Sequence, residues 1–122
     1  MTYRAPKGTD DILPPDSCEW VTAERVFLDL AERYGYGLVM TPLFESTELF
    51  SRGIGEDTEV VEKQMYTFID KGGRSVTLRP EGTASVIRSL IPAGGVIGTF
   101  KGFYWGPLFR DERPQKGRRR QF

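Results

Sequence analysis

The sequence lacks histidine altogether and contains one cysteine, Cys18, among its 122 residues. Without histidine, catalysis by a histidine base or a cysteine–histidine pair is excluded in this chain, and so is a zinc site of the usual ligand types. One cysteine cannot form an internal disulfide. The longest apolar runs are far shorter than the ~20 residues of a membrane-spanning helix, and residues 1–8 lack the apolar run of a signal peptide. We therefore expect a cytoplasmic protein with no membrane span and no protein-bound metal.

Charge is balanced overall but unevenly distributed, with 17 basic and 17 acidic side chains. Residues 110–122 carry six basic and two acidic side chains, a net charge of +4, which leaves −4 on the first 109 residues. A polyanion would therefore meet the C-terminal segment. Charge alone, however, favours a solvated basic tail.

An amphipathic helix is predicted after an extended N-terminal segment, residues 1–16. Asp16 and Glu19 have the spacing of a capping box, so the helix should begin near Ser17. One face of this helix should pack against the rest of the fold. The apolar residues of that face are Trp20, Ala23, Phe27, Leu30, Ala31 and Tyr34. A short apolar strand should follow and end at Pro42.

The rest of the chain predicts antiparallel hairpins separated by a helix. Two β-prone runs, 66–70 and 75–78, are joined by a glycine turn, which is typical of a hairpin. A helix is predicted over 81–90. Residues 100–122 predict a second hairpin that turns at 116–117. This order favours an α+β fold in which helices flank a mostly antiparallel sheet.

The length allows one modest domain rather than two. The chain ends at Phe122 inside a β-prone run, where natural termini rarely lie. We therefore expect a single truncated domain over residues 1–122.

Charged and aromatic side chains converge on the second predicted hairpin. Strand alternation gives two sets that each share one face: Leu108, Arg110 and Glu112, and then Arg118, Arg120 and Phe122. Guanidinium groups bind phosphate, a ring can stack on a base, and a carboxylate can accept from an amino group, so this surface suits a nucleoside triphosphate. A ladder of weak surface ion pairs explains the same spacing equally well.

A second candidate site lies at the predicted turn between strand and helix, where Glu81, Gly82 and Thr83 follow one another. A glycine lets the backbone approach a ligand closely, and the Glu81 carboxylate can hold an ammonium group. Alternatively, Glu81 and Thr83 are first-turn residues that favour the helix dipole. Taken alone, the turn favours this second interpretation.

Taken together, these segments resemble one enzyme family. Residues 109–122 closely resemble motif 2 of class II histidyl-tRNA synthetases. Residues 78–83 are similar to that family's amino-acid-binding turn, and residues 7–14 to its N-terminal segment. Residues 17–42 look like motif 1, which builds the dimer interface. Residues 60–68 strengthen the match, so the resemblance covers nearly the whole chain.

The resemblance implies which residues bind the amino acid. Glu81 and Thr83 would hold the α-amino group of histidine, and Gly82 would leave room between them. Arg110 would be the catalytic residue, because it would contact both the histidine carboxylate and the α-phosphate of ATP. These roles agree with the strand faces derived above.

The resemblance also implies the ATP-binding residues, which include Arg110. Glu112 would bind the adenine amino group. Arg118 would reach toward the phosphates, and Phe122 would stack on adenine. The metal expected here is Mg²⁺ carried by ATP as substrate, not a metal bound by the protein.

The implied activity is that of an aminoacyl-tRNA ligase, which activates histidine with ATP to histidyl-adenylate and charges tRNA. The implied partners are histidine, ATP, the acceptor end of tRNA (bound weakly by this chain), and a second copy bound through the motif 1-like segment. Activity should be reduced or lost, because motif 3, the histidine-specific loop and the anticodon-binding domain are missing. Arg119 also stands where the family usually has an aromatic residue.

Two alternatives stay open at this point. The first is a non-catalytic histidine-binding paralogue, such as the regulatory subunit of ATP phosphoribosyltransferase. The second is a structural or assembly module that keeps the motifs as packing surface and binds nothing. Arg110, Glu112 and Arg118 together favour ATP binding.

Overall fold

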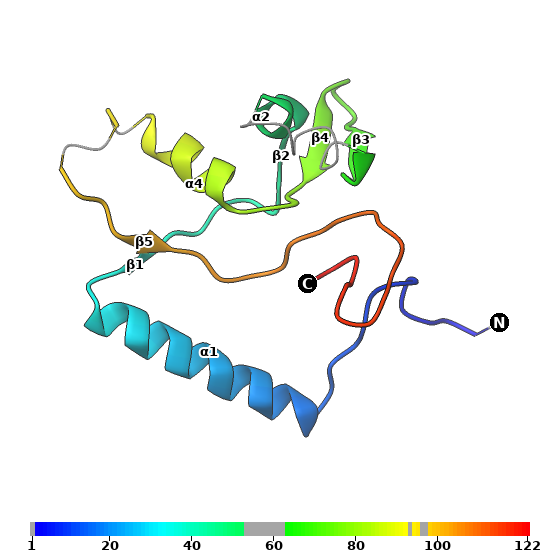
Figure 1. Cartoon of the computed structure of the whole chain (residues 1–122). Coiled ribbons are helices and arrows are strands. Elements are labelled where there is room, and N and C mark those ends of the chain that lie inside the picture. Colours follow the sequence, from blue (N-terminus) through cyan, green and yellow to red (C-terminus); the bar gives the residue numbers. More distant parts are fainter. Residues whose placement is uncertain (1, 53–62, 93, 96–97) are drawn as a thin grey trace.

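The computed structural model describes residues 2–52, 63–92, 94–95 and 98–122. Its elements, in chain order, are α1 (Asp16–Arg33), β1 (Gly37–Leu38), β2 (Phe44–Ser46), α2 (Thr47–Ser51), β3 (Thr67–Ile69), β4 (Ser75–Leu78), α4 (Thr83–Leu90) and β5 (Gly102–Phe103). Figure 1 shows β1 and β5 lying between α1 and the other helices and strands. This is the α+β fold expected from the sequence.

One part of the fold is a small packed unit made of β2, β3, β4, α2 and α4, which we call the packed unit (residues 44–51 and 67–90). Its sheet is antiparallel, with the strand order β2–β4–β3. The pairing of β3 with β4 confirms the predicted hairpin. The pairing of β2 with β4 was not expected. The helix α2 contacts both α4 and β4, which closes the unit.

A hydroxyl network fixes the centre of this sheet. The fully buried Thr77 side chain lies 2.9 Å from the hydroxyls of both Thr47 and Thr67, and Thr47 lies 2.7 Å from the Ser75 hydroxyl. These hydrogen bonds join α2, β3 and β4. Because a buried hydroxyl is costly without a partner, the network specifies the strand register as well as stabilising it.

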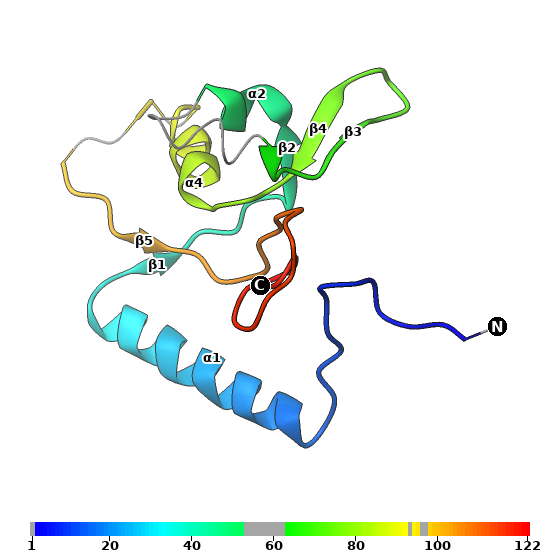
Figure 2. The ribbon, with the colours of Figure 1, turned by 45° about the vertical axis from the view of Figure 1, so that its right-hand side comes forward.

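The remaining elements form a second region, which we call the open layer (residues 16–38 and 102–105). Here β1 and β5 pair in parallel, with Gly37 opposite Gly102 and Leu38 opposite Phe103. The mostly antiparallel expectation therefore holds for the packed unit but not here. Figure 2 shows the open layer from a second angle, with α1 beside β1 and β5.

The helix α1 buries none of its residues. Phe27 packs against the rings of Phe103 and Trp105, at centroid distances of 5.5 and 5.0 Å. Trp20 and Leu30 are 59% and 51% exposed. The expectation that the apolar face packs against the rest of the fold is therefore wrong for most of the face, since the described part of the chain places little against it.

The predicted capping box is also absent. The N-cap residue is Pro15, and no side chain makes a capping hydrogen bond there. Asp16 and Glu19 instead both lie in the first turn, where carboxylates favour the helix dipole. The acidic spacing therefore predicted the position of the helix start but not its hydrogen bonds.

The C-terminal segment folds as the predicted second hairpin. The backbones of Leu108 and Phe122 exchange two hydrogen bonds, of 2.7 and 2.9 Å, and Gln115 and Arg118 close the turn. The N-terminal segment lies along this hairpin, because the Arg120 N–H donates to the Gly8 carbonyl at 2.9 Å. The first and last segments of the chain are thus side by side.

The accessible surface is 9691 Å². A folded monomer of 13.8 kDa is expected to expose about 6,600 Å². The chain therefore leaves much more surface open than a compact monomer of its size would. None of the described helices combines the length and the apolar character needed to cross a membrane. Part of the family-like segment 60–68 lies outside the described residues.

Candidate functional site

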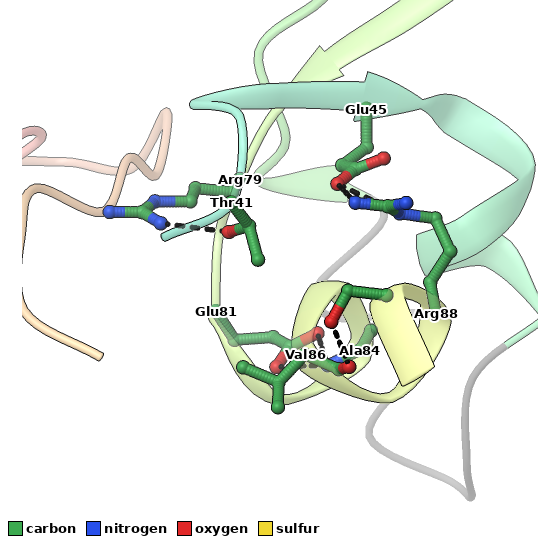
Figure 3. Close-up of polar contacts among 8 residues, drawn as sticks. Thr41, Glu45, Arg79, Glu81, Ala84, Val86 and Arg88 are labelled. Carbon is green, nitrogen blue, oxygen red and sulfur yellow. Dashed lines mark hydrogen bonds and ion pairs between the residues drawn. The ribbon is translucent and has the colours of Figure 1, made fainter. Parts of the chain in front are cut away.

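The turn between β4 and α4 is built by a buried proline and a capping carboxylate. Pro80 is fully buried and follows β4, and α4 begins at Thr83. The Glu81 carboxylate accepts hydrogen bonds from the backbone N–H groups of Thr83 at 2.6 Å and Ala84 at 3.2 Å. Figure 3 shows Glu81 turned toward the first turn of α4. The sequence favoured Glu81 as a first-turn residue, but Glu81 lies just before the N-cap residue Gly82 and caps the helix through its carboxylate.

The space beside Gly82 is filled by Tyr104, a residue that the sequence did not single out. A Cβ atom at Gly82 would overlap the Tyr104 ring. The ring thus packs directly on the backbone between Glu81 and Thr83. The only sign of Tyr104 in the sequence is that it is an aromatic residue shortly before Gly106-Pro107. That pattern cannot predict a contact with Gly82, which lies more than 20 residues earlier.

Arg110 lies next to this turn. Its Nε donates to the Pro80 carbonyl at 3.3 Å, and its guanidinium lies 5.6 Å from the centre of the Phe122 ring. The structure therefore brings together two sites that the sequence had placed on separate segments. A cation at this position faces the carboxylate-bearing turn on one side and an aromatic ring on the other.

Glu112 and Arg118 form a loose pair on the same hairpin. Arg118 Nε lies 4.0 Å from a carboxylate oxygen of Glu112, whose side chain is only 13% exposed, against 61% for Arg118. At that distance the pair is weak, so the Arg118 guanidinium can bind another anion. The Glu112 side chain is largely enclosed.

Arg119 and Arg120 both contact the N-terminal segment of the chain. Arg120 donates to the carbonyls of Glu112 at 3.1 Å and Lys7 at 3.2 Å, and Arg119 pairs with Asp10 at 2.9 Å. The grouping of Arg120 with a ligand-facing set is therefore not supported, because its donors are used by the chain itself. Arg119 is about half-exposed, as expected for a face that meets water.

Tyr66 lies near Asp111 and Arg120, and its pKa is shifted by its surroundings. Partial burial and the nearby Asp111 carboxylate raise the pKa of Tyr66, while Arg120 opposes the rise. The Asp111 carboxylate also lies 3.7 Å from Arg120. Asp111 and Arg120 belong to opposite strands of the hairpin, so this ion pair links the two strands.

The fold is found in solved structures of known proteins. The solved structure of apo S. aureus histidyl-tRNA synthetase is similar with a TM-score of 0.76 and 43% identity, covering 99% of this chain and 31% of that one. A structure of an ATP phosphoribosyltransferase regulatory subunit/histidyl-tRNA synthetase from Bacillus halodurans C is 22% identical, with a TM-score of 0.68, over 98% of this chain and 30% of that one. At that identity the second likeness shows the fold alone.

Relatives in sequence agree with the structural likeness. The histidine–tRNA ligase of Desulforudis audaxviator (strain MP104C) is 56% identical over 124 residues, covering 100% of this chain and 30% of that protein. The histidine–tRNA ligase of Fervidobacterium nodosum (strain ATCC 35602 / DSM 5306 / Rt17-B1) is 54% identical over 122 residues, covering 98% and 29%. The chain thus spans about 30% of the length of the curated relatives it matches.

The α+β fold, with the Arg110 hairpin against the Glu81 turn, is that of the catalytic region of an aminoacyl-tRNA synthetase. The family model for histidyl-tRNA synthetase matches residues 8–122. The chain belongs to the histidyl-tRNA synthetase family.

Proposed function

We propose that this chain supplies part of the site that activates histidine with ATP for the charging of tRNA. The observation that carries the proposal is the 3.3 Å hydrogen bond from Arg110 Nε to the Pro80 carbonyl. It brings a cation to the start of the Glu81–Thr83 turn, which is where an amino-acid carboxylate would meet an α-phosphate. The family of the relatives supports the same reaction.

Glu81, Gly82 and Thr83 form the amino-acid end of the proposed site. The Glu81 carboxylate already accepts two backbone N–H groups, but an ionised carboxylate has about four lone-pair positions. It can therefore accept from the α-ammonium of histidine without leaving the helix start. The exposed Thr83 hydroxyl is a second acceptor on the same turn.

The hairpin forms the ATP end. Arg110 would contact the histidine carboxylate and the α-phosphate, and the exposed Arg118 would reach the outer phosphates. Adenine would stack on the Phe122 ring, which is 51% exposed. The enclosed Glu112 carboxylate would accept from the adenine amino group. Arg110 then moves from stacking on Phe122 to pairing with phosphate.

The chemical step needs no nucleophile from the protein. A histidine carboxylate oxygen forms a bond to the α-phosphorus, and the bond from that phosphorus to the pyrophosphate oxygen breaks. Arg110 offsets the negative charge that builds up on the phosphoryl oxygens, and holding both substrates in line removes most of the entropic barrier. ATP would enter as its Mg²⁺ complex, in which the metal offsets part of the phosphate charge.

Two further partners belong to the proposal. A second copy of the chain would pack on the exposed face of α1, which includes Trp20, Leu30 and Tyr34. The acceptor end of tRNA would approach the basic hairpin, where the contacts should be weak and salt-sensitive.

Ligand binding is the sharpest first test, because it needs fewer parts of the enzyme than turnover. Isothermal titration of the chain with ATP and with histidine should detect both ligands. Arg110→Ala should weaken ATP binding about tenfold or more, since a charge-assisted hydrogen bond is worth about 1.5–3 kcal/mol. Arg113→Ala is the matched control, because Arg113 is an exposed arginine of the same hairpin outside the proposed site.

Other outcomes of this titration would distinguish the alternatives. Histidine binding without ATP binding would favour a non-catalytic histidine-binding protein. Binding of neither ligand, or equal losses in Arg110→Ala and Arg113→Ala, would overturn the proposed site.

A further inference from the structure

Arg79 is a buried cation whose side chain bridges two distant segments. It is 3% exposed. Its Nε donates to the Pro107 carbonyl at 2.9 Å, and its Nη1 donates to the Thr41 hydroxyl at 3.2 Å. Figure 3 shows the guanidinium pointing away from α4 toward Thr41. The side chain therefore connects the segment after β1 with the segment that leads into the hairpin.

The backbone of Arg79 joins the same segments. Its N–H donates to the Leu43 carbonyl at 2.9 Å, and its carbonyl accepts from the Phe109 N–H at 3.0 Å. Arg79 thus holds Pro107 with its side chain and Phe109 with its main chain. The hydrogen bond between Arg79 and Phe109 lies directly before the site on both segments. Pro80 follows Arg79, and Arg110 follows Phe109.

Gly106 leaves the space that the guanidinium needs. A Cβ atom at Gly106 would lie 2.6 Å from Arg79 Nη2, and the Gly106 φ angle of +148° disfavours any other residue. The chain therefore has a glycine where the guanidinium comes closest to the backbone. Arg79 and Gly106 fit each other as a pair.

A buried guanidinium is costly to desolvate, and within the described residues Arg79 makes no ion pair with a carboxylate. Its hydrogen-bond partners are a carbonyl and a hydroxyl, which orient the planar fork but do not neutralise it. A residue selected only for stability would be better replaced by an apolar side chain. The geometry therefore suggests a directional role.

We propose that Arg79 is a positioning residue that sets the Pro107–Phe109 segment against the end of β4, so that Arg110 reaches the Pro80 carbonyl. Its effect on ligand binding rests on the proposed function. Its effect on the backbone does not, because the Phe109 N–H bond exists without any ligand.

The test compares Arg79→Lys, Arg79→Ala and Thr41→Val with the control Arg88→Ala. Arg88 is a partly buried arginine, and it pairs with Glu45 at 2.9 Å on the other side of the packed unit from the Arg79 guanidinium (Figure 3). ATP affinity is measured by titration at a temperature where circular dichroism shows each variant folded. Amide hydrogen exchange of Phe109 and Arg110 is measured without ligand.

Arg79→Ala and Arg79→Lys should each weaken ATP binding by about tenfold or more, because misplacing a contact group by ~1 Å can cost up to about a hundredfold. A lysine keeps the charge but cannot reach both acceptors at once. Thr41→Val should have a smaller effect in the same direction, and Arg88→Ala should change ATP affinity less than about twofold. Guanidinium ion at millimolar concentration should restore part of the affinity of Arg79→Ala and none in the control.

Exchange of the Phe109 and Arg110 amides should speed up in the Arg79 variants and stay unchanged in Arg88→Ala. If the unmodified chain binds no ATP, the proposed function fails, but the exchange measurement still decides the role of Arg79. Unchanged exchange at both amides in Arg79→Lys would overturn the positioning role. Equal losses of ATP affinity in Arg79→Lys and Arg88→Ala would overturn it as well. If Arg79→Ala does not fold, Arg79→Lys and Thr41→Val decide in its place.

Discussion

The packed unit and the open layer differ in how completely they are buried by the described chain. The packed unit contains Phe50, 5% exposed, and the fully buried Thr77 and Ser85. In the open layer, α1 has no buried residue, and its strands are two residues long. The packed unit thus has buried side chains at its centre, whereas α1 in the open layer has none.

The difference follows from how each region is connected. In the packed unit, a short turn joins the antiparallel strands β3 and β4, so the contacts of this hairpin are local and cheap in loop entropy. The open layer pairs β1 with β5, which are separated by more than 60 residues. Leu30 is 51% exposed, so covering the rest of it would contribute about half of the ~1.5–3 kcal/mol that full burial of such a side chain provides. Such side chains in the open layer therefore favour a further partner surface.

The largest effect is expected from Phe50→Ala. Removing the one buried large apolar side chain found among the described residues should destabilise the packed unit by about 3–5 kcal/mol. Phe27→Ala is the matched control in the open layer, where the ring is 39% exposed and its loss should cost about 1–2 kcal/mol. Urea unfolding followed by circular dichroism measures both. Equal losses would contradict the difference in burial between the two regions.

A smaller effect is expected from Gly82→Ala, which tests the link between the packed unit and the segment after β5. The Gly82 φ angle of −107° is accessible to alanine, so the overlap with Tyr104 is the only penalty. Overpacking should cost about 1–3 kcal/mol. The penalty should shrink in a Tyr104→Ala background, measured as a double-mutant cycle in urea. A penalty that stays unchanged in that background would mean that the ring does not rest on Gly82.

The sequence predicts the β3–β4 hairpin and α4 of the packed unit, because the signals for both elements are local. The glycine turn after Asp70 and the buried Pro80 before α4 define a hairpin and a helix within a few residues. The pairing of β2 with β4 and of β1 with β5 could not be predicted, because each depends on contacts between segments far apart in the chain. The apolar stripe of α1 predicted a helix but not what covers it.

The candidate site divides in the same way. Alternation predicted that Arg110 and Phe122 share a face, and their cation–ring contact agrees. Alternation also placed Arg120 on the face of Arg118 and Phe122, but the carbonyls of Lys7 and Glu112 take its donors, so the chain itself uses this arginine. Arg79 was missed because an arginine beside a proline gives no sign of burial.

A charge on the exposed face of α1 should weaken self-association and change the stability of the monomer very little. Leu30→Glu places a charge on the exposed face of α1, so it should weaken dimerisation while changing monomer stability by less than about 0.5 kcal/mol. Sedimentation at several concentrations measures the association. Glu32→Ala, an exposed change on the same helix outside the apolar stripe, is the control. Two variants that dimerise equally would exclude this face as the contact surface.

The smallest effect is expected from Asp70→Asn in the hairpin turn of the packed unit. The Asp70 carboxylate accepts from the Arg74 N–H and the Gly72 N–H, each at 2.9 Å, and it pairs with Arg74 Nε at 2.8 Å. The hydrogen bond from the Arg74 backbone, followed by its side chain and the Gly72 backbone, lowers the pKa of Asp70 below its ordinary value of 3.8.

A carboxyl group whose pKa is lower in the folded state stabilises that state above its unfolded pKa. The contribution is lost as the pH falls through the folded value. The urea midpoint of Asp70→Asn should therefore lie below that of the unmodified chain at pH 7, and the two should converge as the pH drops below 3.8. Asp29→Asn, which removes an exposed pair with Arg33 in the open layer, should change the midpoint at pH 7 less than Asp70→Asn does. A difference between the Asp70 variant and the unmodified chain that stays constant down to pH 2 would show that the amide loses something other than the charge. In that case the local turn would not explain why the packed unit holds together better than the open layer.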